Sequence, residues 1–339
     1  MSINSFSYKA KKHHIRLISI VIISLLYAYF LSSLPNEYFR DRTSYIRYAL
    51  YSHEILQQYD GYTYLVNEPL FLLFNFIFSG ISNFELVPKI YVFFISFTIF
   101  YLIVRNSNNI VSGLLACLLL FFIPFTFHLQ LVVLRQGIAT ALLLWSTHFF
   151  WENKKVFYTI CFLLSFFHIS FIIIFLILIT DYILSLYIKN IKIKLLANSL
   201  ILFVSSSVML GLAKSLGVRQ AQSDHLLQNN NGFGGFVLFL FLFIFLYFRG
   251  LNNTYNDRYG RISLIGILAY LSFYYTIPVS GRLISSILPF ALIYLASSNN
   301  LKIIFSFFIL LLVSFIIFVS SISGGSLTFE GVSYLNSLF

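Results

Sequence analysis

Charge is the property that this sequence of 339 residues has least of. Asp, Glu, Lys and Arg make up 10% of its residues, against about 25% in ordinary soluble domains. Hydrophobic residues make up 59%, and the mean hydropathy is +0.87. So few polar groups cannot cover a protein surface in water, which excludes a soluble globular fold. Long apolar runs satisfy their backbone hydrogen bonds in a bilayer as helices, so the composition predicts an all-α, polytopic membrane protein.

The sequence also lacks the motifs of several enzyme classes. Its two cysteines, Cys117 and Cys161, lie in apolar stretches and match neither a disulfide framework nor a Cys/His metal pattern. No HExxH zinc motif, P-loop or GxSxG nucleophile elbow is present. We therefore expect no metal, no cofactor and no nucleotide. The net charge of +11 sits in short loops, where it reports membrane topology, so we expect no nucleic-acid partner.

A helix needs about 20 apolar residues to cross the core of a bilayer. The stretches that approach this length are residues 15–34, 87–104, 110–127, 136–151, 194–213, 233–250, 262–278, 283–298 and 302–321. Lys9, Lys11 and Lys12 precede the first stretch, and no small-residue cleavage site follows it before Pro35. We therefore interpret it as an uncleaved anchor with a cytoplasmic N-terminus.

Two further apolar segments have unusual lengths. Residues 156–183 exceed one span and could form either a single tilted helix or a hairpin that turns at His168. The hairpin places the lysines on both sides of this segment in the cytoplasm, as the positive-inside rule prefers. Residues 70–84 are short for a span, which favours a re-entrant or interfacial helix within an outer segment at 35–86. Together these assignments predict about 10–11 membrane segments, with 214–232 as an outer loop.

The predicted topology also separates basic residues by type. Lysines predominate on the cytoplasmic side, whereas arginines predominate outside. A planar guanidinium binds phosphate oxygens bidentately, while a lysine acts as a point charge. The outer arginines are therefore candidate anion ligands. They are Arg40, Arg42, Arg47, Arg135, Arg219 and Arg282.

Residues 35–69 are the most polar part of the chain. Six of the 11 acidic residues fall between Glu37 and Glu85, and seven of the 23 tyrosines fall between Tyr38 and Tyr64. Carboxylates accept hydrogen bonds from sugar hydroxyls, and aromatic rings cover the apolar faces of sugars. The segment is thus a candidate glycan-binding surface. The alternative is a solvated loop with a tyrosine belt at the membrane interface.

Three ionisable residues stand beside or within apolar sequence. A charged side chain at the centre of a membrane helix costs about 2.5–3.5 kcal/mol, so Arg135 and Arg282 indicate a partner or a cavity. The alternative is an arginine whose side chain extends to the membrane interface. Two such arginines on separate helices could converge on one pyrophosphate. His168 could serve a function or could be a core residue that is hydrogen-bonded to a neighbouring serine.

These residues lie in blocks that resemble a known family. The blocks are Asp41-Arg42 with Tyr45, Asn67-Glu68-Pro69, Leu134-Arg135-Gln136-Gly137, Ser165-Phe166-Phe167-His168 and Ser280-Gly281-Arg282. In order and spacing they resemble the EpsG/Wzy-type integral-membrane polysaccharide polymerases over about residues 35–300. Gly281 departs from the pattern, because an acidic residue would fit the family better at that position.

The resemblance implies one GT-C-like helical domain over residues 1–339, in the inner membrane of a bacterial cell. Such a glycosyltransferase would join repeat units carried on undecaprenyl diphosphate, at the face of the membrane towards the periplasm or exterior. The product would be O-antigen of lipopolysaccharide, capsule or exopolysaccharide. The expected partners are the lipid-linked donor and acceptor glycans and the bilayer, with a chain-length regulator protein as a further candidate.

Residue roles follow from the resemblance and from the chemistry of the leaving diphosphate. For the diphosphate we expect Arg135 and Arg282, then Arg219 and Arg42. For the acceptor hydroxyl we expect Glu68 or His168, with Asp41 and Asp60 as alternatives. For glycan contact we expect Tyr45, Tyr62, Tyr64 and Gln136.

Two other functions fit parts of the pattern. A flippase or transporter for lipid-linked oligosaccharides would also need arginines and an aromatic cavity, but the chain shows no internal repeat and its polar residues gather on one face. A membrane O-acyltransferase acting on the glycan would suit an intramembrane histidine, but it would need cytoplasmic residues for its acyl donor.

Overall fold

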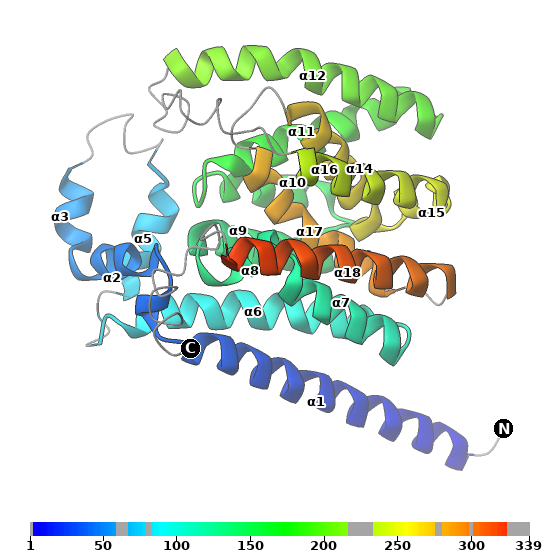
Figure 1. The fold of residues 1–339 in the computed structure, drawn as a ribbon, viewed down its shortest axis with the longest axis horizontal. Helices are drawn as coiled ribbons and strands as arrows, with labels where there is room; N and C mark the ends of the chain where they lie inside the picture. Colours follow the sequence, from blue (N-terminus) through cyan, green and yellow to red (C-terminus); the bar gives the residue numbers. More distant parts are fainter. Residues whose placement is uncertain are drawn as a thin grey trace.

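The computed structural model describes residues 3–58, 67–78, 80, 83–215, 233–274, 280–297 and 301–323. Within these ranges every regular element is a helix, which confirms the predicted all-α membrane protein. In Figure 1 most helices run along one direction as a bundle, and the short helices of the outer segment lie together at one end. We call this end, which carries α2, α3 and α5, the site end.

The bundle begins with two long apolar helices. α1 (Ile3–Ser33) packs along α6 (Leu86–Asn106), and the outer segment connects them at the site end. That segment contains η1 (Asn36–Tyr38), α2 (Arg42–Leu50), α3 (Ser52–Gln57) and α5 (Pro69–Phe78). With 10 residues, α5 is too short to cross a bilayer, as the sequence predicted for this stretch.

The stretch predicted as one segment at 110–127 is broken. α7 (Ile110–Phe122) and α8 (Pro124–Leu131) meet at an angle of 73°. Pro124 has no N–H to continue the hydrogen bonds of α7, so the helix ends before it. The break leaves the carbonyl of Leu120 without a helical partner, and the hydroxyl of Thr126 donates to it at 2.8 Å.

The segment predicted as a hairpin or a single span is a hairpin. It follows α9 (Leu134–Phe150) and consists of α10 (Lys154–Leu164) and α11 (Ser170–Tyr187), which pack against each other. The turn at 165–169 is held by short-range backbone bonds, such as that from the N–H of His168 to the carbonyl of Leu164 at 3.1 Å. His168 therefore lies in the turn, where the sequence predicted it.

The remaining helices complete the bundle around α17. They are α12 (Ile191–Ser215), α14 (Phe233–Phe248), α15 (Leu251–Asn256), α16 (Arg258–Phe273), α17 (Ser280–Ala296) and α18 (Leu301–Ser323). α17 is almost fully buried from Leu283 onwards. α16 approaches it closely because Gly266 has no side chain: a Cβ there would lie 2.5 Å from Ile287.

Three helical stretches in the described chain are long and apolar enough to cross a membrane: His14–Ser33, Leu86–Asn106 and Ser170–Tyr187. The bent pair α7–α8 makes a fourth if it is one span. Several other predicted segments form shorter apolar helices, among them Ser280–Ala296. The total of 10–11 segments stays a prediction.

A buried ion pair holds the hairpin to its neighbours far along the sequence. Asp181 of α11 is 2% exposed, and Arg261 of α16 donates to its Oδ2 from both Nε, at 2.7 Å, and Nη2. The hydroxyl of Tyr255 donates to Oδ1 at 2.7 Å. The Nζ of Lys194 lies 4.5 Å from the centroid of the Tyr255 ring. The carboxylate of Asp181 thus connects α11 with α15 and α16, and Lys194 adds α12 through the ring of Tyr255.

Asp181→Asn should lower the stability of the folded protein by about 3–5 kcal/mol, because Arg261 then keeps its charge in a buried place without an anion. Thermal unfolding of the detergent-purified protein measures the loss. The matched control is Glu152→Gln, which removes an exposed carboxylate and should leave the midpoint unchanged. Equal midpoints for the two variants would contradict a stabilising role for Asp181.

Candidate active site

The site is organised around Glu68, whose backbone has an unusual conformation. Its φ is +59°, a left-handed value that costs a residue other than glycine about 1–3 kcal/mol. Its carbonyl accepts the N–H groups of Phe71 and Leu72 at 3.0 and 3.1 Å and so begins α5, with Pro69 at the first position. The N–H of Leu70 donates to the carbonyl of Phe166 at 3.1 Å, which fixes α5 to the hairpin turn.

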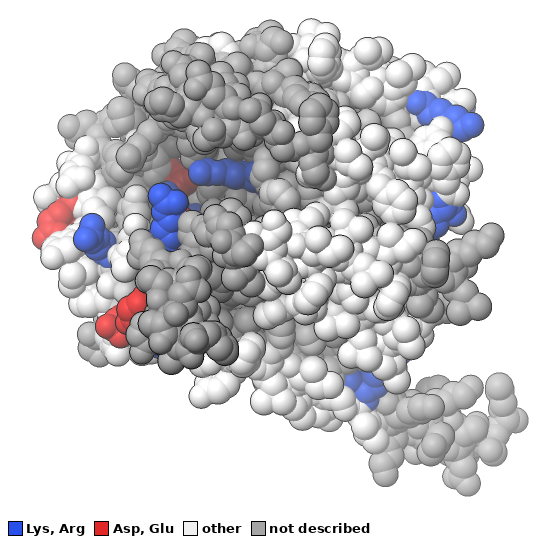
Figure 2. Space-filling view, viewed as in Figure 1, with Lys and Arg blue, Asp and Glu red and all other residues white. Residues whose placement is uncertain are grey.

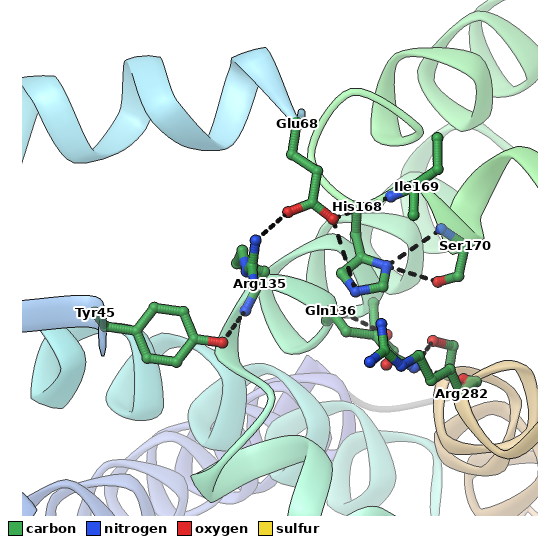
Figure 3. Close-up of polar contacts among 10 residues, drawn as sticks. Tyr45, Glu68, Arg135, Gln136, His168, Ile169, Ser170 and Arg282 are labelled. Atoms are coloured by element: carbon green, nitrogen blue, oxygen red, sulfur yellow. Dashed lines mark hydrogen bonds and ion pairs between the residues drawn. The ribbon is translucent and has the colours of Figure 1, made fainter. Parts of the chain in front are cut away.

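The Glu68 carboxylate joins three segments that are far apart in the sequence (Figure 3). Its Oε2 lies 2.5 Å from Nη1 of Arg135, in the first turn of α9. Its Oε1 accepts the N–H of Ile169 at 3.3 Å and lies 3.9 Å from Nε2 of His168, both in the hairpin turn. The side chain of Glu68 is 9% exposed, so the interaction with Arg135 is largely shielded from water.

Arg135 faces the open side of this cluster. Its side chain is 35% exposed, and one of its nitrogens is used by Glu68. The guanidinium carbon lies 5.6 Å from the ring centroids of both Tyr48 and Phe71, and the N–H of Arg135 donates to the hydroxyl of Tyr45 at 3.4 Å. Aromatic rings thus lie beside the guanidinium, and its exposed part is accessible to a ligand.

His168 is buried and neutral. The N–H of Ser170 donates to its Nδ1 at 3.3 Å, and the Ser170 hydroxyl lies 2.7 Å from the same nitrogen. Burial, reinforced by the positive charges of Arg282 and Arg135, holds the pKa of His168 well below its usual range. Since Nδ1 accepts a hydrogen bond, the proton of the neutral ring is on Nε2, the nitrogen that faces Glu68.

Gln136 positions the second arginine. Its Nε2 donates to the backbone carbonyl of Arg282 and, at 2.8 Å, to the hydroxyl of Ser286. These bonds fix the first turn of α17 to the start of α9. In Figure 3 the side chain of Arg282 lies beside Gln136 and His168. No ion pair or hydrogen bond of the Arg282 guanidinium is seen among the described residues, and the nearby charges are those of Arg135, Glu68 and Asp41.

The structure therefore brings together four of the residues expected from the sequence: Glu68, His168, Arg135 and Arg282. Tyr45 and Gln136 also join the cluster, but they are 3% and 1% exposed and contact protein atoms. We reassign them from glycan contact to positioning of the arginines. Asp41 lies at the start of α2, partly buried, and its charge is felt by Arg282. Asp60, Tyr62, Tyr64 and Arg219 lie outside the described residues.

Arg42 is placed differently from the expectation. It is fully buried, and it donates to the carbonyls of Leu131 and Leu34, each at 3.1 Å. Its guanidinium carbon lies 4.0 Å from the ring centroid of Phe39, and burial lowers its pKa to about 10. Nε and Nη1 are directed at backbone carbonyls, and Nη2 is buried without a partner. Arg42 therefore joins the outer segment to α1 and α8, and its burial removes it from the diphosphate candidates.

Two contributors were not expected from the sequence. Ser286 meets Gln136 only because α9 and α17 pack together across 150 positions of sequence. The second is the main-chain N–H of Ile169, which every residue type except proline would supply, so the sequence could not single it out. Ser170, by contrast, stands two positions after His168, and the sequence already offered it as a hydrogen-bond partner.

In the view of Figure 2, charged side chains are sparse over most of the bundle. Figure 2 shows basic and acidic side chains on the side of α2 and α3, some of them inside a hollow. Within the described chain no cluster of His, Cys, Asp and Glu could hold a metal ion. The arrangement suits an anionic ligand, with guanidinium groups to bind it and one carboxylate within reach.

The fold and the cluster define a helical membrane protein with an arginine–carboxylate–histidine site at one end of its bundle. Comparison with known families shows that the chain belongs to the EpsG family, which it matches over residues 15–335. This confirms the resemblance seen in the sequence and extends it to nearly the whole chain. No curated protein and no solved structure matches the chain.

If the two arginines form an anion site, inorganic pyrophosphate should raise the thermal midpoint of the purified protein, since a ligand of the folded state stabilises it. Arg282→Gln should abolish most of this rise, because it removes one of the two guanidinium groups. The control is Arg47→Gln, which changes an exposed arginine of α2 and should respond like the wild type. The site is not an anion site if pyrophosphate shifts Arg282→Gln as much as the control.

Proposed function

We propose that this protein is a glycosyltransferase that polymerises oligosaccharide repeat units carried on undecaprenyl diphosphate. Membership of the EpsG family suggests a polymerase of polysaccharides. The observation that carries the proposal is the convergence of Arg135 and Arg282, from separate helices, beside the buried carboxylate of Glu68. Two guanidinium groups with a nearby base are what transfer from a lipid diphosphate requires.

The reaction breaks one bond and forms another. A hydroxyl oxygen of the acceptor glycan attacks the anomeric carbon of the donor, and the bond from that carbon to the diphosphate oxygen breaks. The lipid diphosphate leaves with the bonding electrons, and the acceptor hydroxyl gives up its proton. The arginines stabilise the negative charge that develops on the leaving oxygen, which is the larger electrostatic requirement of the step.

Glu68 is our candidate for the group that takes the proton. It is the carboxylate that the described structure places against both Arg135 and the hairpin turn. His168 is a poor base here because its Nδ1 already accepts a hydrogen bond and its Nε2 carries the proton. We assign His168 to orienting Glu68, together with the N–H of Ile169. Arg135 lies on the open side, where it can meet a diphosphate without leaving Glu68.

The proposal also assigns an orientation of the protein in the membrane. The site end would face the periplasm or the exterior, with the basic N-terminus of α1 in the cytoplasm of a bacterial inner membrane. The repeat unit that the cell supplies determines which polysaccharide is made. O-antigen, capsule and exopolysaccharide are therefore all compatible with the residues described. A chain-length regulator protein stays a predicted partner.

Arg135→Lys should reduce polymerisation by about 10²-fold or more, because lysine keeps the charge but loses the fork that binds phosphate oxygens. The measurement is the length of the surface-glycan ladder in a strain whose own copy of the gene is deleted. Arg47→Lys serves as the exposed control. A full ladder from a well-expressed Arg135→Lys protein would contradict the diphosphate role.

The same deletion strain separates the proposal from the alternatives. A polymerase defect leaves single repeat units attached to the lipid carrier. A flippase defect leaves no surface glycan, and an acyltransferase defect leaves long chains without a substituent.

Glu68→Gln should abolish transfer, because the amide cannot take up the proton. The protein should stay folded, because the amide oxygen can still accept the N–H of Ile169. Glu54→Gln, on the exposed face of α3, is the matched control. Purified lipid-linked repeat units and gel analysis of the products give the rate. Wild-type rates from Glu68→Gln would exclude this carboxylate as the base.

His168→Asn should lower the rate but keep the shape of the pH profile between about pH 6 and 8. The depressed pKa of His168 means that the ring stays neutral as the pH falls through its usual titration range, so no step in the wild-type profile belongs to it. A wild-type step near pH 6.5 that disappears in His168→Asn would show that His168 does titrate.

A further inference from the structure

The short helix α5 has two apolar faces, and one of them packs against Tyr91 of α6. Three phenylalanine rings surround the Tyr91 ring, with centroids 6.2, 5.8 and 5.7 Å away; they belong to Phe71, Phe74 and Phe78. These positions recur at a spacing of three or four residues, so they form one face of the helix. The opposite face is exposed and also apolar, and it consists of Leu73, Phe76 and Ile77. Hydrophobicity alone therefore does not determine which face of α5 turns towards α6.

Asn75 is the only polar side chain of α5, and it lies on the face that meets Tyr91. The hydroxyl of Tyr91 donates to its Oδ1 at 2.9 Å, and its Nδ2 donates to the carbonyl of Phe71 at 2.8 Å. Asn75 and Tyr91 are both buried, so water does not replace either partner. A buried amide or hydroxyl without a partner is unfavourable. Other rotations of α5 would break this bond, so the hydrogen bond selects the observed one.

The selected rotation determines where Phe71 lies, and Phe71 lies beside Arg135. The ring of Phe71 is fully buried, and its centroid is 5.6 Å from the guanidinium carbon of Arg135. Tyr45 and Tyr48 pack edge-to-face against the same ring, each with centroids 5.9 Å apart. Phe71 stands about one turn before Asn75 on α5. A rotation of α5 by one residue position, about 100°, would therefore take the ring away from the guanidinium.

The same rotation affects Glu68, which immediately precedes α5. The carbonyl of Glu68 accepts the first N–H groups of this helix, and its carboxylate pairs with Arg135. Further along α5, the ring of Phe74 packs against Phe167 of the hairpin turn, with centroids 5.8 Å apart. The helix thus follows one partner of the ion pair directly and supplies a ring beside the other. Its orientation on α6 therefore influences both charged groups of the site.

We infer that Tyr91 and Asn75 are positioning residues for the arginine–carboxylate site. Their hydrogen bond holds α5 in the rotation that places Phe71 beside Arg135 and Glu68 against the hairpin turn. Any effect on glycan transfer rests on the function proposed above. The direct effect is on the affinity of the site for a diphosphate, because the guanidinium of Arg135 is the group that α5 orients.

The test removes one hydroxyl at a time from two tyrosines of the bundle. Tyr91→Phe removes the hydrogen bond to Asn75 and keeps the ring. The matched control is Tyr27→Phe on α1, because the Tyr27 hydroxyl also donates to an amide oxygen, that of Gln130, at 3.0 Å. Its ring stacks on Phe100, nine positions after Tyr91 on the same helix α6. Thermal unfolding gives the midpoint of each variant, and titration of the detergent-purified protein with inorganic pyrophosphate gives Kd.

Both variants should lower the midpoint to a similar extent, since each loses a hydroxyl of the same type. Tyr91→Phe should weaken pyrophosphate by about tenfold, which corresponds to part of one hydrogen bond to a charged group. Tyr27→Phe should stay within about twofold of the wild type, since a difference of that size is smaller than the loss of one hydrogen bond. A loss of affinity at equal stability is the result that a merely structural role would not produce.

A second variant separates hydrogen bonding from packing. Asn75→Leu combined with Tyr91→Phe removes both polar groups and keeps side chains of similar size, so its midpoint should return close to that of the wild type. Its Kd for pyrophosphate should stay about tenfold weaker, because α5 no longer has the polar contact that selects its rotation.

Three results would overturn the positioning role. The first is equal pyrophosphate affinity of Tyr91→Phe and Tyr27→Phe. The second is wild-type affinity of the double variant, which would show that ring packing alone places α5. The third is a wild-type protein that binds no pyrophosphate, since there would be no anion site to position. If the variants behave as expected but the wild type transfers no glycan, the proposed function fails and the positioning role stands.

Discussion

The ion pair between Glu68 and Arg135 is the interaction on which the site depends. Each partner comes from a different part of the chain, and the carboxylate also accepts the N–H of Ile169 in the hairpin turn. The carboxylate is largely shielded from water, so loss of Arg135 would leave a buried charge without its partner. The left-handed backbone of Glu68, whose carbonyl starts α5, turns the chain into this position at a cost in strain.

The hairpin of α10 and α11 is held at both ends by carboxylates. At the site end its turn bonds to Glu68, and towards the other end Asp181 binds Arg261 and Tyr255. Two fixed points on one rigid element determine where the turn lies, and with it His168. The turn that carries His168 is therefore held by packed helices on both sides, which limits its movement.

Much of this could be predicted from the sequence because the signals are local. The length of the apolar stretches predicts membrane helices, and the distribution of lysines favours the hairpin. Ionisable residues beside apolar runs single out Arg135, Arg282 and His168. The break at Pro124 was missed because the apolar run continues through it, although proline is itself the local cause. The position of Arg42 was missed for another reason. An arginine can bind phosphate or pack inside the protein, and the sequence does not distinguish these roles. The surroundings of Arg42, two backbone carbonyls and a phenylalanine ring, give it a packing role.

The sequence by itself determined the class of protein, the family and the residue types of the site, since these follow from composition and from short motifs. The tertiary structure decided which of the candidates meet. Glu68 and Arg135 are 67 positions apart, and Gln136 and Ser286 are 150 apart. Contacts over such separations arise from helix packing, which depends on side-chain shape along whole faces and leaves no mark in any one segment.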